Sequence, residues 1–242
     1  MSIRESELNT LLNFSDFPEE TVRRIAAACV PRVFNKGQTV YFSGQEKGRF
    51  SILLSGEVEI YQTGGGKRVV IQMLKPGDFF GDLSFTDHAA ELAGSHARAK
   101  MPSGVCSMSA ADLKSILHSS FPFTLLLLTA LRDRLHQAES KIKDLAISSV
   151  ETRVINELFR YIVRHGREDG AFWKIEKKLT HQFIADMTGI ARETATKVLG
   201  ALEKAEALSW SDEGFLTLHR ENIMRVCPQC LMMKAEKGGV RK

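Results

Sequence analysis

The sequence lacks long apolar runs, and it lacks the N-terminal pattern of a secretory signal. No apolar stretch reaches the roughly 20 residues that a membrane-spanning helix needs. The N-terminus does not place a charged segment before an apolar one, as a signal peptide does. These absences lead us to expect a cytoplasmic protein that has no membrane partner.

Cysteine is scarce, because the chain has only Cys29, Cys106, Cys227 and Cys230. Four scattered cysteines are too few for a disulfide framework, and in a cytoplasmic protein we expect them to be reduced. Cys29 is then a small core residue. Cys227 and Cys230 form a CxxC pair, which supplies two thiolates where a closed zinc or iron–sulfur site needs four ligands. The pair is a weak candidate for a metal clip or a redox switch, and inert tail cysteines fit the pattern equally well.

Common catalytic motifs are absent as well. The chain has no phosphate loop of the Walker type, no HExxH, and no Ser-His-Asp set that we can place. The run Gly64-Gly65-Gly66 lacks the strand-to-helix context of a nucleotide-binding loop and indicates a turn instead. We therefore predict that the protein is not an enzyme.

The length and charge allow a nucleic-acid-binding protein. The 242 residues are enough for one large or two ordinary domains, and the net charge is +4. Residues 148–242 carry 16 Lys and Arg against 13 Asp and Glu, a net charge of +3. This modest basic excess is compatible with DNA binding without being diagnostic of it.

The first half of the chain has the pattern of an antiparallel β domain that follows a short helix. Residues 1 to about 30 are predicted to be helical, with a helix-start pattern at residues 15–20, and strand signals follow from Val33 to about Met108. Residues 57–61 alternate polar and apolar side chains, as a half-buried strand does. Residues 63–67 are a glycine turn, and residues 68–74 are the second strand of the hairpin. Many short strands separated by Gly and Pro predict a sandwich or jelly roll.

A long helix is predicted from Phe121 to about Ala146. Its apolar residues step alternately by three and four, which makes the seam of a coiled coil: Leu128, Leu131, Leu135, Ala138, Ile142 and Leu145. Charged residues flank this seam, including Lys141 and Asp144, and we expect them to be in water. The alternative is a helix packed on its own domain, but the charged flanks favour a parallel homodimer.

Two short helical patterns meet at Gly189, which can adopt the left-handed conformation that ends a helix. In the second pattern the apolar residues recur on one face, and the opposite face collects Arg192, Glu193, Thr196, Lys197 and Gly200. Arg and Lys can donate to guanine, and Glu can accept from cytosine. Two helices around such a turn are typical of a helix-turn-helix, and the hairpin predicted at residues 208–218 adds a wing. A merely solvated polar face is the alternative for this helix taken alone.

The order of jelly roll, seam helix and winged helix-turn-helix resembles the CRP/FNR family of bacterial transcription regulators. The resemblance runs from about Phe14 to Leu218 and is carried most strongly by residues 54–58, 74–83 and 191–194. It implies an α+β fold with an effector-sensing jelly roll at residues 1–120, a dimerisation helix at 121–147 and a DNA-binding domain with a basic tail at 148–242. It also implies a homodimer that reads a palindrome in double-stranded DNA, with half-sites roughly 34 Å apart, and RNA polymerase as a partner.

The resemblance assigns roles to the reading helix. The cAMP-responsive branch reads a TGTGA-type half-site with Arg-Glu-Thr-x-x-Arg, which is Arg192-Glu193-Thr194-Ala195-Thr196-Lys197 here. Arg192, Glu193 and Lys197 are then the base-reading residues, and Lys197 replaces a bidentate arginine with a point charge. A second set is expected mostly to hold phosphates: Thr180, Gln182, Thr194 and Thr196. Ala191 stands where a serine usually caps the helix, so a cap that contributes about 1 kcal/mol is lost.

The effector pocket departs from the cyclic-nucleotide members. By resemblance it comprises Phe79, Phe80, Gly81, Asp82, Leu83, Ser84, Ala93 and Gly94. Asp82 replaces a longer glutamate, and Ala93-Gly94 stands where those members have the Arg-Ser pair for the cyclic phosphate. A buried phosphate without a guanidinium loses its main charge-assisted partner. We therefore predict that cAMP is not bound in the usual way.

A haem is a weaker possibility for the effector. Phe79, Phe80 and Phe85 favour an apolar or flat ligand, and His88 and His96 are candidate iron ligands. Two histidines in a loop and a strand are, however, more often plain surface or hydrogen-bonded residues. The sequence as a whole predicts a DNA-binding regulator. One alternative is a ligand-binding module whose helix-turn-helix contacts protein, and another is an ordinary cAMP-responsive regulator.

Overall fold

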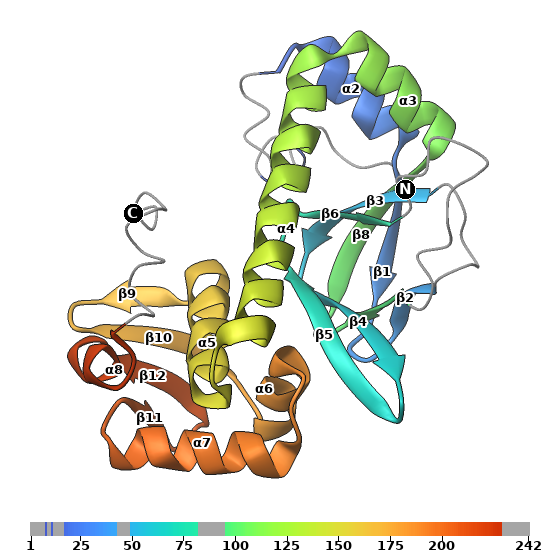
Figure 1. Cartoon of the computed structure of the whole chain (residues 1–242). Coiled ribbons are helices and arrows are strands. Elements are labelled where there is room, and N and C mark those ends of the chain that lie inside the picture. Colours follow the sequence, from blue (N-terminus) through green and yellow to red (C-terminus); the bar gives the residue numbers. More distant parts are fainter. Residues whose placement is uncertain (1–7, 9–10, 12–16, 43–48, 82–94, 229–242) are drawn as a thin grey trace. The chain divides into compact units, whose positions relative to one another are not determined.

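The computed structural model describes residues 17–42, 49–81 and 95–228, together with Leu8 and Leu11. The chain divides into two compact units, residues 1–138 and 139–242. Figure 1 shows the elements of both units.

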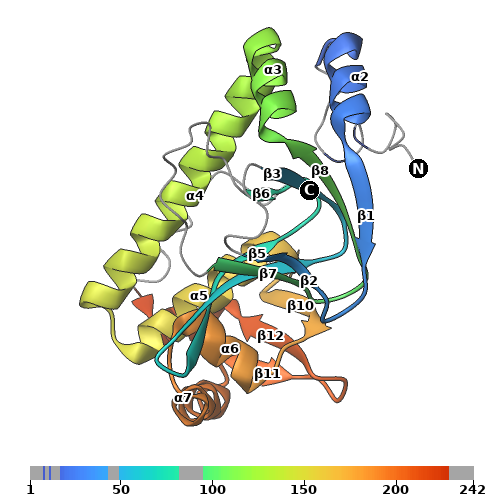
Figure 2. The same cartoon turned by 90° about the vertical axis from the view of Figure 1, so that its right-hand side faces the viewer.

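The first unit is a helix-flanked jelly roll, as the sequence predicts. Its elements follow in this order: α2 (Glu19–Ala28), β1 (Val30–Phe34), β2 (Thr39–Phe42), β3 (Arg49–Ser55), β4 (Val58–Gly64), β5 (Lys67–Leu74), β6 (Phe79–Gly81), β7 (Ser95–Ala99), β8 (Ser103–Ser109), α3 (Ala110–Ser119) and α4 (Phe121–Ile147), which continues into the second unit. One sheet has the strand order β1-β8-β3-β6 and the other β2-β7-β4-β5. Every pairing in both sheets is antiparallel. Helices α2 and α3 lie side by side at one end of the strands (Figures 1 and 2).

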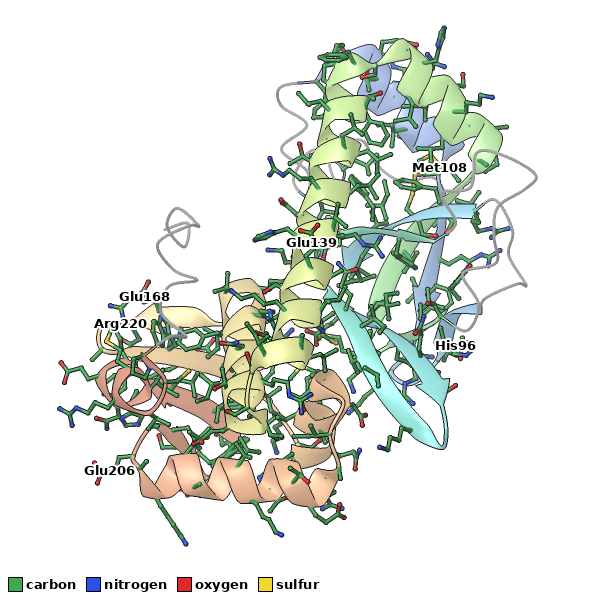
Figure 3. All side chains as sticks on the ribbon, viewed as in Figure 1. His96, Met108, Glu139, Glu168, Glu206 and Arg220 are labelled. Carbon is green, nitrogen blue, oxygen red and sulfur yellow. A yellow bond between two sulfur atoms is a disulfide. The ribbon has the colours of Figure 1, made fainter. Side chains whose placement is uncertain are left out.

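Two apolar clusters stabilise this unit. One joins the first sheet to the helices, and it includes Phe50, Phe79, Met108, Phe123 and Leu127. Figure 3 shows Met108 between the strands and the helices above them. The other cluster includes Leu53, Val58, Leu74, Phe80 and Val105 from strands of both sheets. Burial of these side chains supplies most of the driving force for folding of the unit.

The hairpin of β4 and β5 follows the predicted turn, but Glu59 on β4 is not in water. The carboxylate of Glu59 is 0% exposed, because three cations surround it. Arg68 contacts Glu59 Oε1, Arg98 Nε donates to the same oxygen over 2.8 Å, and Lys100 Nζ lies 3.4 Å from Oε2. The Arg68 guanidinium also lies 4.1 Å from the centre of the Tyr61 ring. The strand is therefore present as predicted, but its burial does not alternate, because Glu57 and Glu59 are buried together with Val58 and Ile60.

The expectation of reduced cysteines is wrong for this structure. Cys29 and Cys106 form a disulfide that joins the end of α2 to the middle of β8, across a sequence separation of 77. Both residues are buried in the cluster beneath the helices, so Cys29 is a core residue as predicted. Pro31 pairs with Cys106 in the β1–β8 ladder, which brings Cys29 close to its partner. Sequence spacing gave no sign of this pairing.

The second unit is a small sheet with helices packed on it. After the end of α4 it contains α5 (Val150–His165), β9 (Arg167–Asp169), β10 (Phe172–Lys178), α6 (His181–Thr188), α7 (Arg192–Lys204), β11 (Leu208–Trp210), β12 (Phe215–His219) and α8 (Arg220–Val226). The strand order is β11-β12-β10-β9. Arg220 and Glu168 form an ion pair that ties α8 to β9, and Figure 3 shows the two side chains together.

The long helix has the predicted bounds to within one residue at its end. It runs from Phe121 to Ile147, and α5 begins at Val150. Lys141 and Asp144 were expected in water, but Asp144 is buried and Lys141 is partly buried against α5. Among the described residues no single helix is long and apolar enough to cross a membrane. Helices α3 and α4 reach that length and apolarity only when taken together, and the chain bends by 116° between them.

Candidate nucleic-acid interface

The helix-turn-helix is formed by α6 and α7. Thr180 caps α6, because its hydroxyl accepts a hydrogen bond from the Phe183 N–H over 3.1 Å. Gly189 ends the helix in the left-handed conformation, with φ 70° and ψ 28°, as predicted. The N–H of Ile190 then donates to the Ala185 carbonyl over 3.1 Å. This turn sets the direction in which α7 leaves α6.

The apolar face of α7 is buried, and its polar face is open. Ala195, Leu199 and Leu202 are buried against the rest of the unit. The side chains on the opposite face are exposed: Arg192, Glu193, Thr196 and Lys197. Helix α7 lies at the outer edge of its unit in both views (Figures 1 and 2). Ala191 is the N-cap and makes no side-chain cap bond, because a methyl group cannot accept a hydrogen bond.

Three of the predicted phosphate-holding residues also bond within the unit. Thr180 is occupied by its cap bond, and Gln182 Nε2 donates to Asp186 Oδ1 over 2.7 Å. Thr196 Oγ1 lies 3.0 Å from His181 Nδ1. The fourth residue, Thr194, is half-buried. Each hydroxyl or amide keeps capacity for a further hydrogen bond, so these contacts fix side-chain positions without excluding a phosphate.

His181 is a residue that the sequence reasoning missed. It is the first residue of α6, and its ring contacts Thr196 on α7. The centre of its ring lies 5.8 Å from that of Trp210 on β11. One side chain therefore touches both helices of the motif and lies near the wing. No pattern in the sequence signals this role, because it depends on how α6, α7 and β11 pack.

The predicted wing is a short β hairpin. Strands β11 and β12 pair antiparallel, and Ser211 and Phe215 close the turn through the Ser211 N–H, which donates to the Phe215 carbonyl over 2.9 Å. Gly214 has φ 81°, the conformation that the sequence predicts for a glycine turn. Strand β12 also pairs with β10, so the wing is anchored in the sheet.

The seam of α4 is exposed over its whole length in the single chain. The five large apolar side chains of the seam are between 37% and 66% exposed: Leu128, Leu131, Leu135, Ile142 and Leu145. Ala138 is exposed as well. An exposed row of large apolar side chains is unusual on a helix that packs only on its own domain, because contact between apolar surface and water is unfavourable.

The described part of the predicted effector pocket is a short strand. Phe79 and Phe80 on β6 are both buried, one in each apolar cluster. Phe79 packs against Phe50 and Phe123, with ring centres 5.3 and 6.1 Å apart. Gly81 has φ 102°, and a Cβ there would lie 2.3 Å from the Arg49 carbonyl oxygen, so no other residue fits without movement. The other predicted pocket residues lie outside the described residues: Asp82, Leu83, Ser84, Ala93 and Gly94.

The candidate metal and haem ligands do not form a site in the described residues. His96 lies on β7, where its ring is 5.3 Å from that of Tyr61, and Figure 3 labels it on the sheet. His88 and Cys230 lie outside the described residues, as does Phe85. Cys227 is buried and disulfide-bonded, so it is not a thiolate ligand here. Within the part of the chain that the structure describes, no three His, Cys, Asp or Glu residues are grouped to hold a metal.

Comparison with known proteins agrees with this architecture. Residues 31–120 match the model of the cyclic nucleotide-binding domain, and residues 152–225 match that of the Crp-like helix-turn-helix domain. The chain is 28% identical over 170 residues to the CRP-like cAMP-activated global transcriptional regulator of Mycobacterium tuberculosis, which covers 70% of this chain and 75% of that protein. It is also 28% identical over 191 residues to the global nitrogen regulator of Synechocystis, covering 77% and 85%.

A solved structure shows the same fold. A mutant of CooA from Carboxydothermus hydrogenoformans superposes with a TM-score of 0.71 at 20% identity, covering 88% of this chain and 90% of that one. The curated relatives are transcription regulators rather than enzymes. With an antiparallel jelly roll, a long helix and a winged helix-turn-helix in this order, the chain belongs to the CRP/FNR family of transcription regulators.

Proposed function

We propose that the protein is a homodimeric regulator that binds a palindromic DNA site and responds to an effector in its jelly roll. The exposed polar face of α7 carries the proposal, because the buried opposite face fixes the helix and leaves Arg192, Glu193 and Lys197 open to a major groove. In this proposal Thr180, Gln182, Thr194 and Thr196 hold phosphates on either side. RNA polymerase is the expected protein partner, and the cytoplasm the expected location.

A second copy of the chain is the proposed occupant of the exposed seam. The apolar residues repeat with the spacing of a coiled coil, and the single chain leaves them in water. A parallel pairing would relate the two reading helices by a two-fold axis, as a palindrome requires. We divide the chain accordingly into a sensing domain at residues 1–120, a dimerisation helix at 121–147 and a DNA-binding domain at 148–242.

The effector is proposed to be something other than cAMP bound in the usual way. Ala93-Gly94 replaces the Arg-Ser pair that would hold a cyclic phosphate, and Asp82 is one carbon shorter than the usual glutamate. The relatives do not point to one effector by name, since one is cAMP-activated and another is a nitrogen regulator. The rings of Phe79 and Phe80 are already packed in the two apolar clusters, so they give little support to the proposal of a haem bound against them.

Fluorescence anisotropy on a TGTGA-type palindrome, with and without cAMP and against a scrambled duplex, tests the proposal. We expect specific binding that cAMP does not change, with an affinity that falls steeply as salt rises. Binding that appears only with cAMP would identify an ordinary cyclic-nucleotide regulator. Binding to neither duplex at low salt, with or without cAMP, would favour a helix-turn-helix that contacts protein.

Arg192→Ala tests the base-reading role directly. It should weaken binding to the palindrome by about 1–3 kcal/mol and relax the preference at one base pair of each half-site. Lys204→Ala is the matched control, because it removes one exposed cation from the last residue of α7. Equal losses on specific and scrambled DNA would show that Arg192 contacts only phosphate.

A further inference from the structure

His181 and Thr196 form a contact between the two helices of the helix-turn-helix that the proposed function does not use. His181 is the first residue of α6, and its Nδ1 lies 3.0 Å from Oγ1 of Thr196 on α7. Thr196 is exposed on the polar face of α7, one turn beyond Arg192 and directly before Lys197. All of these residues belong to the second compact unit. The contact therefore holds a hydroxyl group on the face that is proposed to enter the groove.

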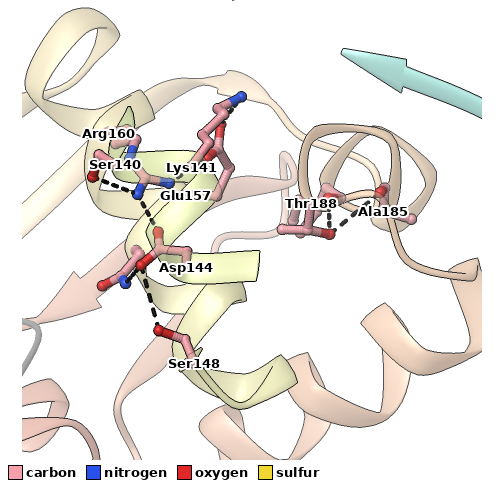
Figure 4. Close-up of polar contacts among 10 residues, drawn as sticks. Ser140, Lys141, Asp144, Ser148, Glu157, Arg160, Ala185 and Thr188 are labelled. Carbon is pink, nitrogen blue, oxygen red and sulfur yellow. Dashed lines mark hydrogen bonds and ion pairs between the residues drawn. The ribbon is translucent and has the colours of Figure 1, made fainter. Parts of the chain in front are cut away.

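The hydroxyl of Thr196 is held differently from that of a threonine on the adjacent helix. A threonine within a helix commonly bonds to a carbonyl three or four residues earlier on the same helix. Thr188 on α6 does so, because its Oγ1 donates to the carbonyls of Ile184 over 2.8 Å and Ala185 over 3.2 Å (Figure 4). Within the residues that the structure describes, Thr196 makes no such bond and instead contacts the ring of His181. The histidine thus selects one orientation of a side chain that the helix alone would leave with two.

His181 is itself fixed from the side of the wing. Its ring centre lies 5.8 Å from that of Trp210 on β11, at an interplanar angle of 48°, which is within the range of favourable aromatic pairs. Both side chains are half-buried. Thr180 precedes His181, and its cap bond to the Phe183 N–H fixes the backbone where α6 begins. The position of the His181 Nδ1 is therefore set by α6 and the wing together.

The contact contributes little to folding, because it lies at the surface. Thr196 is exposed and His181 is half-buried, so water competes for both groups in the free protein. The same hydrogen bond becomes stronger where a DNA surface excludes that water. An ordered hydroxyl also loses less conformational freedom on binding than a mobile one. These features favour a role in a DNA complex over a role in stability.

The chemistry of the pair determines the direction of its hydrogen bonds when a phosphate is bound. A hydroxyl has one hydrogen to donate, and a neutral imidazole has one nitrogen that donates and one that accepts. The phosphate oxygens of DNA accept hydrogen bonds, so Thr196 must donate its hydrogen to the phosphate. Thr196 then accepts from His181, which requires a ring proton on Nδ1. The order is Nδ1–H of His181, O–H of Thr196 and phosphate oxygen.

We propose that His181 is a positioning residue for DNA recognition, which holds Thr196 in the orientation that binds a phosphate of each half-site. The ligand of the pair is a phosphate oxygen of double-stranded DNA, and one relay of two hydrogen bonds forms on each protomer. Because the ring of His181 also packs on Trp210, the relay links the wing to the reading helix. This inference rests on the proposed function, because it needs α7 to bind in a groove.

A double-mutant cycle between protein and DNA tests the relay in the full-length protein. Single phosphates of the palindrome are replaced by methylphosphonates, which lack the charged oxygen, and binding is measured for the wild type and for Thr196→Val. At one phosphate of each half-site we expect the replacement to weaken the wild type by roughly tenfold. The same replacement should weaken Thr196→Val by less than about twofold, because the contact is already absent.

Two results of this cycle would overturn the proposal. Losses that multiply at every phosphate would show that Thr196 contacts none of them. A changed base preference in Thr196→Val would assign the hydroxyl to a base edge instead.

Variants of the histidine test its positioning role. His181→Ala should bind the palindrome roughly threefold to tenfold more weakly, and His181→Asn should restore most of the loss, because its amide can still donate to Thr196. His219→Ala is the matched control, since His219 Nε2 contacts Ser209 Oγ over 3.1 Å within the wing and does not contact α7. Equal losses in the two alanine variants, or no rescue by asparagine, would refute the role. If His181→Ala does not fold, His181→Phe keeps a ring against Trp210 without the nitrogen and serves in its place.

A third measurement needs no DNA, so it separates this inference from the proposed function. The ring nitrogens of the histidines are followed by NMR at about pH 8, above the range in which an imidazole normally titrates. We expect Thr196→Val to shift the Nδ1 resonance of His181, and Ser209→Ala to shift that of His219 alone. An unshifted His181 would refute the contact, whether or not the protein binds DNA. With the palindrome bound we expect a proton on Nδ1 of His181, and a proton on Nε2 alone would refute the relay.

Discussion

Two glycines of the DNA-binding unit should respond to alanine with opposite signs. Gly189 ends α6 with φ 70°, and Gly200 lies inside α7. A Cβ added at either position meets no atom within 4 Å, so a steric clash contributes to neither change. The difference between them is therefore one of backbone conformation alone.

The magnitudes follow from this difference. An L-residue in the left-handed region costs about 1–2 kcal/mol. Alanine also lowers the conformational entropy of the unfolded chain, which offsets roughly 0.4–1 kcal/mol of this cost. Gly189→Ala should therefore destabilise the unit by about 1 kcal/mol, and Gly189→Asn by less, since Asn tolerates this region. Gly200→Ala should instead stabilise it by about 0.8–1 kcal/mol, because alanine is the better residue in a helix interior.

Urea unfolding monitored by tryptophan fluorescence is the assay. Trp173 and Trp210 are the only tryptophans in the sequence, and both belong to the second unit, so the signal reports on that unit alone. With a slope of about 2 kcal/mol per molar urea, each change moves the midpoint by roughly 0.5 M, in opposite directions. Midpoints that move the same way would refute the conformational argument for Gly189.

Three further changes test other parts of the structure. Glu59→Gln should lower the free energy of unfolding, measured by calorimetry, by about 3 kcal/mol, because it leaves three cations around a buried amide. The exposed control Glu176→Gln should lower it by less than about 1 kcal/mol. Replacing Cys29 and Cys106 together by alanine should cost roughly 4 kcal/mol through loss of a 77-residue cross-link, so an unchanged melting temperature would argue against the disulfide. Leu135→Arg should give a monomer by light scattering, and a persistent dimer would place the interface elsewhere.

Local signals in the sequence were sufficient for the elements that depend on local chemistry. Gly189 ends α6 because few other residues adopt its backbone conformation cheaply. The glycine turn after Thr63 joins β4 to β5 as predicted. The three-and-four spacing from Leu128 to Leu145 predicted α4, since that spacing describes one face of a helix.

Features that depend on tertiary packing could not be predicted in this way. Cys29 and Cys106 are brought together by the pairing of β1 with β8, which sequence spacing does not encode. Lys141 and Asp144 have the composition of a solvated helix flank, and only the approach of α5 buries Asp144. His181 acquires its place from the packing of α6 on α7.

The short strand β6 bears on how one fold can serve many effectors over evolution. Phe79 and Phe80 are neighbours in sequence but fill different cores, and the backbone at Gly81 leaves no room for a side chain. Substitution at any of these three positions disturbs the packing of the whole first unit, so selection for a new ligand has little freedom there. New ligand specificities are therefore expected to arise through changes outside β6, while β6 itself changes slowly.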